Sequence, residues 1–265
     1  MQDFFSADTL AFIAAHQDDD VAKLALKFSS RKDIDIRAAL QQIEGRQIAK
    51  SKLPSFANAE NIVYPVKLSM EQCSSEKTAL YKQSVAGDGA SMIDLTSGFG
   101  IDFYFISRHF KKAEYVERNA DLCRIASHNF KSLGATNVSA TNADGIELIK
   151  ASTSHYDLIF LDPARRDKNG KKTVEIKDCE PDVAALKETL LSKCDRMMLK
   201  LSPMLDIKSA VRDLGCVEEV HVVAVDNECK ELLFMLRPKA VIERKIHCVN
   251  LKKNGTTEVF AYNES

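Results

Sequence analysis

From residue 90 to residue 236 the sequence alternates between short apolar runs and longer segments with helical spacing. Strands are predicted at 91–95, 113–117, 137–142, 156–161 and 196–201. Helices are predicted to follow them at 102–111, 120–132, 145–151, 182–193 and 205–214. Strands regularly separated by helices form βαβ units, which predicts an α/β fold with a parallel sheet covered on both faces. The last two strands, 217–225 and 230–236, are too close for a crossover helix and predict an antiparallel hairpin.

Apolar residues recur with helical spacing before this region, over residues 7–28 and 34–48. They predict a small all-α N-terminal domain, residues 1–60, ahead of an α/β domain at 61–238. The run Asp18–Asp20 interrupts the first stretch and fits either a metal site or a solvated helix start, of which the helix start is favoured because acids stabilise N-terminal turns. Residues 239–265 predict a C-terminal β-hairpin.

The charge balance limits the classes of partner. Lys plus Arg number 37 and Asp plus Glu 38, so no long-range field attracts nucleic acid or membrane, and any polyanion site must be local. The seven cysteines form no Cys-x-x-Cys pair and the six histidines no His-x-x-x-His, so no metal is expected and a reduced, cytoplasmic location fits best. No apolar run approaches the roughly 18 residues of a membrane span.

Directly after the first strand comes the glycine turn Asp94–Gly100, Asp-Leu-Thr-Ser-Gly-Phe-Gly. Gly98 and Gly100 supply positive φ or close backbone approach, and we expect unpaired N–H groups of the turn to face a ligand. An ordinary strand-to-helix turn would also explain the motif. Phe103 stands where a dinucleotide fingerprint requires a small residue, which argues against NAD, FAD and a nicotinamide dehydrogenase.

Two acids follow at the ends of the next two strands. Glu117 lies 23 positions after Asp94, and its carboxylate can accept two hydrogen bonds from a ribose diol. Asp144 comes just after the third strand, within Asn142-Ala143-Asp144-Gly145. Glu117 could instead be a surface glutamate, and Asp144 could cap the following helix.

Together these motifs resemble the class I S-adenosylmethionine-dependent methyltransferases over about residues 70–238. The resemblance implies a Rossmann-like sheet of seven strands, parallel with an antiparallel terminal hairpin. It also implies S-adenosyl-L-methionine as cofactor, with the adenine amino group on Asp144 and a ring nitrogen on the Ala143 N–H. The implied cofactor-binding residues are Asp94, Thr96, Gly98, Gly100, Glu117, Ala143 and Asp144.

The strand at 156–161 runs into Asp162-Pro163-Ala164-Arg165-Arg166. This turn resembles the active site of methyltransferases acting on exocyclic amines of nucleic-acid bases, where the acid and a rigid carbonyl orient the acceptor nitrogen. The resemblance assigns catalysis to Asp162, Pro163 and Arg165, although Ala164 and Arg165 replace the second proline and the aromatic residue of the family motif. The next strand ends Lys200-Leu201-Ser202-Pro203 without a cysteine nucleophile, so carbon-5 methylation of uridine is not expected.

Two further features concern the substrate. A basic loop, made of Arg165, Arg166, Lys168, Lys171 and Lys172, fits either phosphate contact or a solvated surface. Ser75, within Glu-Gln-Cys-Ser-Ser-Glu, is interpreted as a helix cap or as a residue lining the pocket.

The overall arrangement is most similar to bacterial methyltransferases with a THUMP-like module, related to the cap guanine-N2 methyltransferases. That module is essentially missing here, and the hairpin at 241–262 would be its start. The expected function is methyl transfer to a base nitrogen of RNA. The alternatives are a protein or small-molecule acceptor, or a catalytically inactive RNA-binding module. The oligomeric state is left open by the sequence.

Overall fold

The computed structural model describes residues 1–165, 175–239 and 241–264, with only the backbone of Arg165. Its helices are α1 (Ala7–His16), α2 (Val21–Lys27), α3 (Ile36–Lys52), α4 (Pro54–Asn58), α5 (Lys67–Gln72), α6 (Glu76–Ala86), α7 (Ile101–Ser107), α8 (Ala120–Ser132), α9 (Gly145–Ala151), α10 (Val183–Leu191) and α11 (Ile207–Leu214). The strands of the main sheet are β1 (Gly89–Asp94), β2 (Phe110–Glu117), β3 (Val138–Asn142), β4 (Leu158–Leu161), β7 (Met197–Leu201), β8 (Val217–Val225), β9 (Glu228–Leu236), β10 (Arg244–Leu251) and β11 (Thr257–Glu264). Two short strands, β5 (Ala164–Arg165) and β6 (Cys179–Glu180), pair separately.

The main sheet has the order β11-β10-β8-β9-β7-β4-β1-β2-β3. The strands from β3 to β7 are parallel, and β9 runs antiparallel between β7 and β8, which confirms the predicted parallel sheet with its antiparallel hairpin. The expected count of seven strands is wrong, because β10 pairs in parallel with β8 and β11 pairs with β10. Ile246 and Val249 of β10 are buried in cores of the sheet, so the C-terminal hairpin extends the sheet.

Helices cover both faces of the sheet because the central strands are apolar on both sides. All four residues of β4 are buried, with Ile159 facing one core and Phe160 the other. The first core takes in side chains of α9, α10 and α11, and the second takes in side chains of α7 and α8. Because these strands are parallel, their carboxyl ends lie at the same edge of the sheet, and the motifs identified in the sequence meet there.

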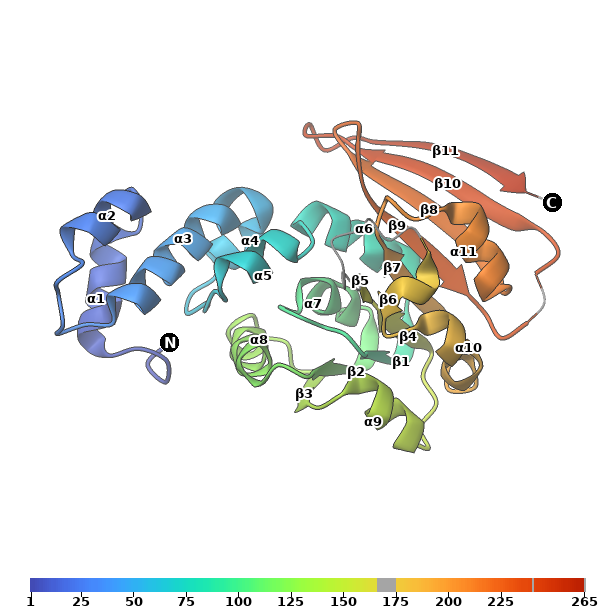
Figure 1. Cartoon of the computed structure of the whole chain (residues 1–265), viewed down its shortest axis with the longest axis horizontal. Helices are drawn as coiled ribbons and strands as arrows, with labels where there is room; N and C mark the ends of the chain where they lie inside the picture. Colours follow the sequence, from blue (N-terminus) through green and yellow to red (C-terminus); the bar gives the residue numbers. More distant parts are fainter. Residues whose placement is uncertain (166–174, 240, 265) are drawn as a thin grey trace.

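The N-terminal region is helical, as predicted, and Figure 1 shows α1–α4 as an arm at the opposite end of the molecule from β10 and β11. Phe12, Leu24 and Ile43 form a small cluster within α1–α3. A second cluster joins Phe56 of α4 to Phe105 of α7, so packing crosses residue 60 and the proposed boundary between domains stays a prediction.

The acidic interruption is part of this helical arm. Asp20 caps α2 through the Lys23 N–H, and Asp18 pairs with Lys50 of α3. This arrangement fits the favoured interpretation of a helix start. No helix within the described ranges combines the length and the apolar character that crossing a bilayer requires.

Candidate functional site

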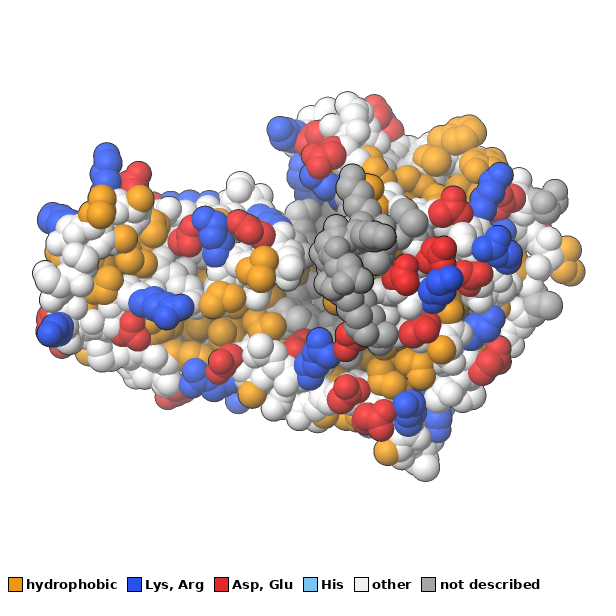
Figure 2. Space-filling view, viewed as in Figure 1, with side chains coloured by type: hydrophobic (Ala, Val, Ile, Leu, Met, Phe, Trp, Pro, Cys, Tyr) orange, Lys and Arg blue, Asp and Glu red, His pale blue; other side chains and the backbone are white. Residues whose placement is uncertain are grey.

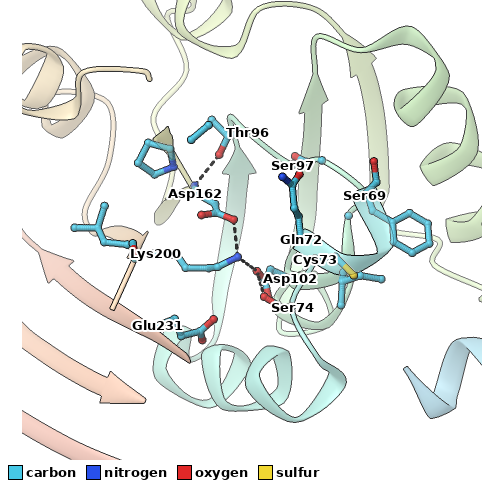
Figure 3. Close-up of a pocket in the computed structure, with 18 of the residues that line it drawn as sticks. Ser69, Gln72, Cys73, Ser74, Thr96, Ser97, Asp102, Asp162, Lys200 and Glu231 are labelled. Carbon is cyan, nitrogen blue, oxygen red and sulfur yellow. Dashed lines mark hydrogen bonds and ion pairs between the residues drawn. The ribbon is translucent and has the colours of Figure 1, made fainter. Parts of the chain in front are cut away.

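Two adjoining cavities lie at the carboxyl ends of the parallel strands. The larger has a volume of about 710 Å³ and is lined by the glycine turn, the segment before α6, the Asp162-Pro163 turn, the end of β7 and the first half of β9. The smaller, of about 210 Å³, is lined by Glu117, Asp144 and neighbouring residues. Thr96, Asp162 and Ala164 line both cavities. These three residues mark a junction between two halves of one site, and Figure 3 shows the larger half.

The glycine turn is confirmed as the link between β1 and α7, with φ of 55° at Gly98 and 83° at Gly100. The expectation of unpaired turn N–H groups is wrong for five of them, of which Leu95 N donates to the Phe160 carbonyl at 3.2 Å. Thr96 N donates to the Asp94 side chain, Gly98 N to the Glu117 carboxylate, and Ser97 N and Gly100 N to backbone carbonyls. The turn is a rigid wall of the cavity because its own chain satisfies these donors.

Asp94, buried at the end of β1, stabilises this turn from the interior of the protein. Its side chain is 1% exposed, and it is absent from the described residues that line the two cavities. Its Oδ1 accepts the Thr96 N–H at 3.0 Å, and its carbonyl accepts the Ser97 hydroxyl at 3.0 Å. Burial raises the pKa of Asp94 well above its ordinary value. Asp94 therefore positions the turn.

Glu117 lines the smaller cavity, as the ribose interpretation requires. Its two oxygens also accept the N–H groups of Gly98 at 2.8 Å and Asn119 at 2.7 Å, which ties the glycine turn to the start of α8. A carboxylate has about four acceptor positions, so both oxygens keep capacity for a ligand.

Asp144 also lines the smaller cavity and caps α9, since its Oδ1 accepts the N–H groups of Ile146 and Glu147. The cap of α9 is therefore confirmed, and the predicted contact of Asp144 with adenine stays a prediction. The expected role of the Ala143 N–H is wrong, because that group donates to the Glu117 carbonyl at 3.2 Å. The Ala143 N–H continues the pairing of β2 with β3 and is therefore not available to a ring nitrogen.

Asp162 lies at the junction of the cavities, held from two sides. Its backbone N–H donates to the Thr96 hydroxyl at 2.7 Å, and its Oδ2 lies 2.5 Å from the Lys200 ammonium. Pro163 and Ala164 follow it along the cavity wall. The structure thus brings the Asp162-Pro163 turn against Thr96 of the glycine turn.

A buried network of charges lies behind Asp162, and the sequence did not reveal it. Lys200 also approaches Asp102 at 3.4 Å, and Lys82 pairs with Asp102 at 3.2 Å and with Glu231 at 2.5 Å. Lys82 is fully buried, and Asp102 and Glu231 are 8% and 3% exposed. Three carboxylates face two ammonium groups, so the network holds one acid in excess.

Mutual attraction within the network outweighs burial for Asp102 and Lys200. Burial alone would raise the pKa of Asp102, but Lys82 and Lys200 hold it below its ordinary value. Burial alone would lower the pKa of Lys200, but Asp162 and Asp102 raise it above its ordinary value. Glu231 differs, since burial raises its pKa despite the attraction of Lys82. The sequence held one signal of this network, the charge of Lys200 inside the apolar strand Met-Met-Leu-Lys-Leu.

Ser74 and Ser75, directly before α6, have different roles. Ser75 caps α6 through the Thr78 N–H, which confirms the cap, and it is not among the described residues lining either cavity. Its neighbour Ser74 lines the larger cavity and donates to Asp102 at 2.7 Å (Figure 3). Ser74 and not Ser75 lines the cavity, and the predicted substrate contact of Ser75 stays a prediction.

The basic loop falls mostly outside the described residues. Arg166, Lys168, Lys171 and Lys172 lie in the range 166–174, and of Arg165 only the backbone is described, paired with Cys179. The predicted roles of Arg165 and Arg166 remain predictions. On the face shown in Figure 2, the described Lys and Arg side chains are interspersed with Asp and Glu, as the balanced charge leads one to expect.

Comparisons with known proteins agree with this architecture. Residues 75–194 match the profile of the family described as conserved hypothetical protein 95. An uncharacterized RNA methyltransferase of Mycoplasma mobile is 29% identical over 135 residues, which cover 49% of this chain and 37% of that protein.

Two solved structures are similar over most of the chain. A candidate methyltransferase from Porphyromonas gingivalis W83 has a TM-score of 0.80 and 32% identity, covering 97% of this chain and 65% of that one. A modification subunit of a candidate type I restriction enzyme from Vibrio vulnificus YJ016 has a TM-score of 0.53 at 10% identity, covering 87% of this chain and 60% of that one, and shows the fold alone.

The chain thus spans about a third of the Mycoplasma protein's length and just under two thirds of the Porphyromonas protein's length. Its sheet order and its similarity to the Porphyromonas structure together show the Rossmann-like fold of the class I methyltransferases.

Proposed function

We propose that this protein is an S-adenosylmethionine-dependent methyltransferase that modifies a nitrogen of an RNA base. The observation that carries the proposal is the junction of the two cavities. Acids from two strand ends, Glu117 and Asp144, lie in the smaller cavity, and Asp162-Pro163 stands where it opens into the larger one. A nucleoside whose ribose and base bind these two acids would direct the group attached to its ribose toward Asp162.

The residues present fit this cofactor. Glu117 has spare acceptor capacity for a ribose diol, and Asp144 keeps Oδ2 for an exocyclic amine. When bound, the cofactor would supply an electrophilic methyl group, and the protein would supply binding and orientation.

Asp162 and Pro163 would orient the acceptor. The Asp162 carboxylate accepts a hydrogen bond from the acceptor nitrogen, while Lys200 and Thr96 hold the carboxylate and the backbone of Asp162 in place. Pro163 restricts the backbone after the acid, which keeps the turn in one conformation. Such positioning supplies much of the rate when a group is transferred from an already reactive donor to an acceptor.

An RNA acceptor is supported by two observations of different kinds. The Mycoplasma relative is named an RNA methyltransferase, and the Asp162-Pro163 turn resembles those of enzymes that methylate exocyclic amines of nucleic-acid bases. A relation to methyltransferases with THUMP-like modules and to the cap guanine-N2 group is part of this proposal. Because the overall charge is balanced, phosphate contacts must be local, with Arg165 and Arg166 as the proposed contacts.

Calorimetry with S-adenosylhomocysteine tests the cofactor half. The wild type should bind at micromolar concentration, and Glu117→Gln should weaken binding about 10-fold or more, because it removes a charged acceptor. Glutamine keeps only one of the two oxygens that accept from Gly98 and Asn119, so thermal unfolding must show that the variant is folded. Asp121→Asn, an exposed acid in the first turn of α8, is the matched control and should bind as the wild type does. Absence of binding by the wild type would favour the inactive module.

Transfer of labelled methyl onto total RNA, compared with protein extract and small metabolites, tests the acceptor half. Label in RNA supports the proposal, and label in protein or small molecules selects the alternative acceptors. Arg165→Glu with Arg166→Glu should weaken RNA binding and reduce its salt dependence. Unchanged binding would remove these two residues from the RNA contact.

A further inference from the structure

A cluster of two histidines and a glutamate lies on the sheet between β8 and β10. Glu219 and His221 are two positions apart on β8 and therefore face the same side of the sheet. His247 of β10 lies directly opposite His221 in the parallel register, so it shares that side. None of the three is among the described residues lining either cavity of the proposed active site.

The ligand atoms of the three residues converge. Nε2 of His221 lies 3.1 Å from Oε2 of Glu219, and Nε2 of His247 lies 3.6 Å from the same oxygen. One ligand atom from each of the three residues lies within 4.8 Å of those of the other two. Zinc–nitrogen and zinc–oxygen bonds of roughly 2.1 Å in a tetrahedron place ligand atoms about 3.4 Å apart. Two of the separations thus match a shared ion closely.

His221 has the outer hydrogen bond that metal-binding histidines require. Its Nδ1 lies 2.7 Å from the phenol oxygen of Tyr81 on α6, which covers this side of the sheet. A phenol can donate or accept, so it can hold the tautomer in which Nδ1 carries the proton and Nε2 offers its lone pair. A hydrogen-bonded second ring nitrogen orients the ligand and increases its basicity.

His247 supplies an independent observation. Its Nε2 is buried and has no hydrogen-bond partner within the described part of the chain, since 3.6 Å to Glu219 exceeds hydrogen-bond distance. A buried polar atom without a partner costs free energy, and an ion between it and Glu219 would satisfy it. The rings of His221 and His247 stack at 4.3 Å and 4°, so both Nε2 atoms can approach one ion after small rotations.

From this geometry we propose that Glu219, His221 and His247 bind a zinc ion, with water as the fourth ligand. Two imidazoles and one carboxylate are a common ligand set for zinc, and the Glu219 side chain is 37% exposed, which leaves a path for the ion and the water. Lys245, opposite Glu219 in the ladder, is exposed and can turn away. The ion would join β10 to β8 and so fasten the C-terminal hairpin to the sheet.

The expectation of no metal rested on spacing along the sequence. Glu219-x-His221 is separated from His247 by the last four residues of β8, all of β9, a loop and the start of β10, so no short ligand motif exists. Only the pairing of β8 with β10 brings the three side chains together.

Zinc titration by calorimetry of the tag-free, chelator-treated protein tests the proposal. The wild type should bind one zinc ion per chain, and His247→Gln or Glu219→Gln should weaken binding at least 100-fold. Tyr81→Phe should weaken it about 10-fold, as loss of an outer hydrogen bond does. Two variants serve as controls and should bind as the wild type does: His155→Gln removes an exposed histidine paired with Asp195, and Cys248→Ser removes a thiol on the opposite side of β10.

Thermal unfolding provides the second readout. Zinc should raise the melting temperature of the wild type and of His155→Gln, but not that of Glu219→Gln, which keeps the shape of the side chain. If His247→Gln does not fold, Glu219→Gln decides the outcome. Absence of stoichiometric zinc binding by the wild type, or equal binding by Glu219→Gln, would overturn the proposal.

Discussion

The ammonium nitrogen of Lys200 lies 2.5 Å from Oδ2 of Asp162, and this pair connects the proposed catalytic turn to the interior of the protein. Behind it, Lys200 approaches Asp102, which in turn meets Lys82, as Figure 3 shows in part. The lysine side chain is 14% exposed and Asp162 is 39% exposed, so the pair leads from the core to the cavity. The position of the proposed acceptor-binding carboxylate therefore depends on buried charges.

Replacing Lys200 with methionine should destabilise the protein by about 3–5 kcal/mol, because Asp102 and Asp162 would lose a buried cation. Urea unfolding measures the change. Lys150→Met, which removes an exposed lysine paired with Glu147 on α9, should cost less than about 1 kcal/mol. Equal losses in the two variants would mean that the Lys200 network contributes no more than a surface pair.

Asp162→Asn should lower the rate of methyl transfer about 100-fold while changing cofactor affinity little, because the variant alters the acceptor position more than the nucleoside contacts. Single-turnover transfer and calorimetry separate the two quantities. The exposed Asp195, changed to Asn, is the control and should leave both unchanged. A loss of cofactor affinity that matches the loss of rate would place Asp162 in cofactor binding instead.

The two glycines of the turn should respond differently to alanine. A Cβ at Gly100 would lie 2.7 Å from Cζ of Phe130, whereas one at Gly98 meets nothing within 4 Å. Both have positive φ, so Gly98→Ala should cost about 1 kcal/mol of strain. Gly100→Ala adds overpacking and should cost about 3 kcal/mol. Chemical denaturation of both variants measures the difference, and equal costs would contradict the crowding at Phe130.

Asp102 should make stability depend on acid pH. Its pKa in the folded protein is below its ordinary value of 3.8, because Lys82 and Lys200 outweigh burial. Its contribution to stability is therefore present above about pH 4 and is lost as the pH falls through the folded-state pKa. The difference in unfolding free energy between wild type and Asp102→Asn should shrink below that pH. A difference that stays constant from pH 7 to pH 2 would contradict this assignment.

Much of the architecture could be predicted because it follows from local patterns. Apolar runs and helical spacing predicted the βαβ units, and the close spacing of β8 and β9 predicted their hairpin. The glycine turn, Glu117 and Asp144 each lie at or just after the end of a strand, so a parallel sheet had to bring them to one edge. The extension of the sheet to nine strands was not predicted, because nothing local in β10 specifies that its partner is β8.

What the sequence by itself determined is the order of elements, the parallel core and the edge at which the site lies, since periodicity and strand ends are properties of short segments. Only the tertiary structure decided which polar groups remain available. It assigned the N–H groups of Thr96, Gly98 and Ala143 to the protein itself, and it joined Lys82, Asp102 and Lys200 from three elements. A buried polar group requires a hydrogen-bond or ion-pair partner. Which group becomes that partner depends on how distant segments pack, and the spacing of residues along the sequence does not specify it.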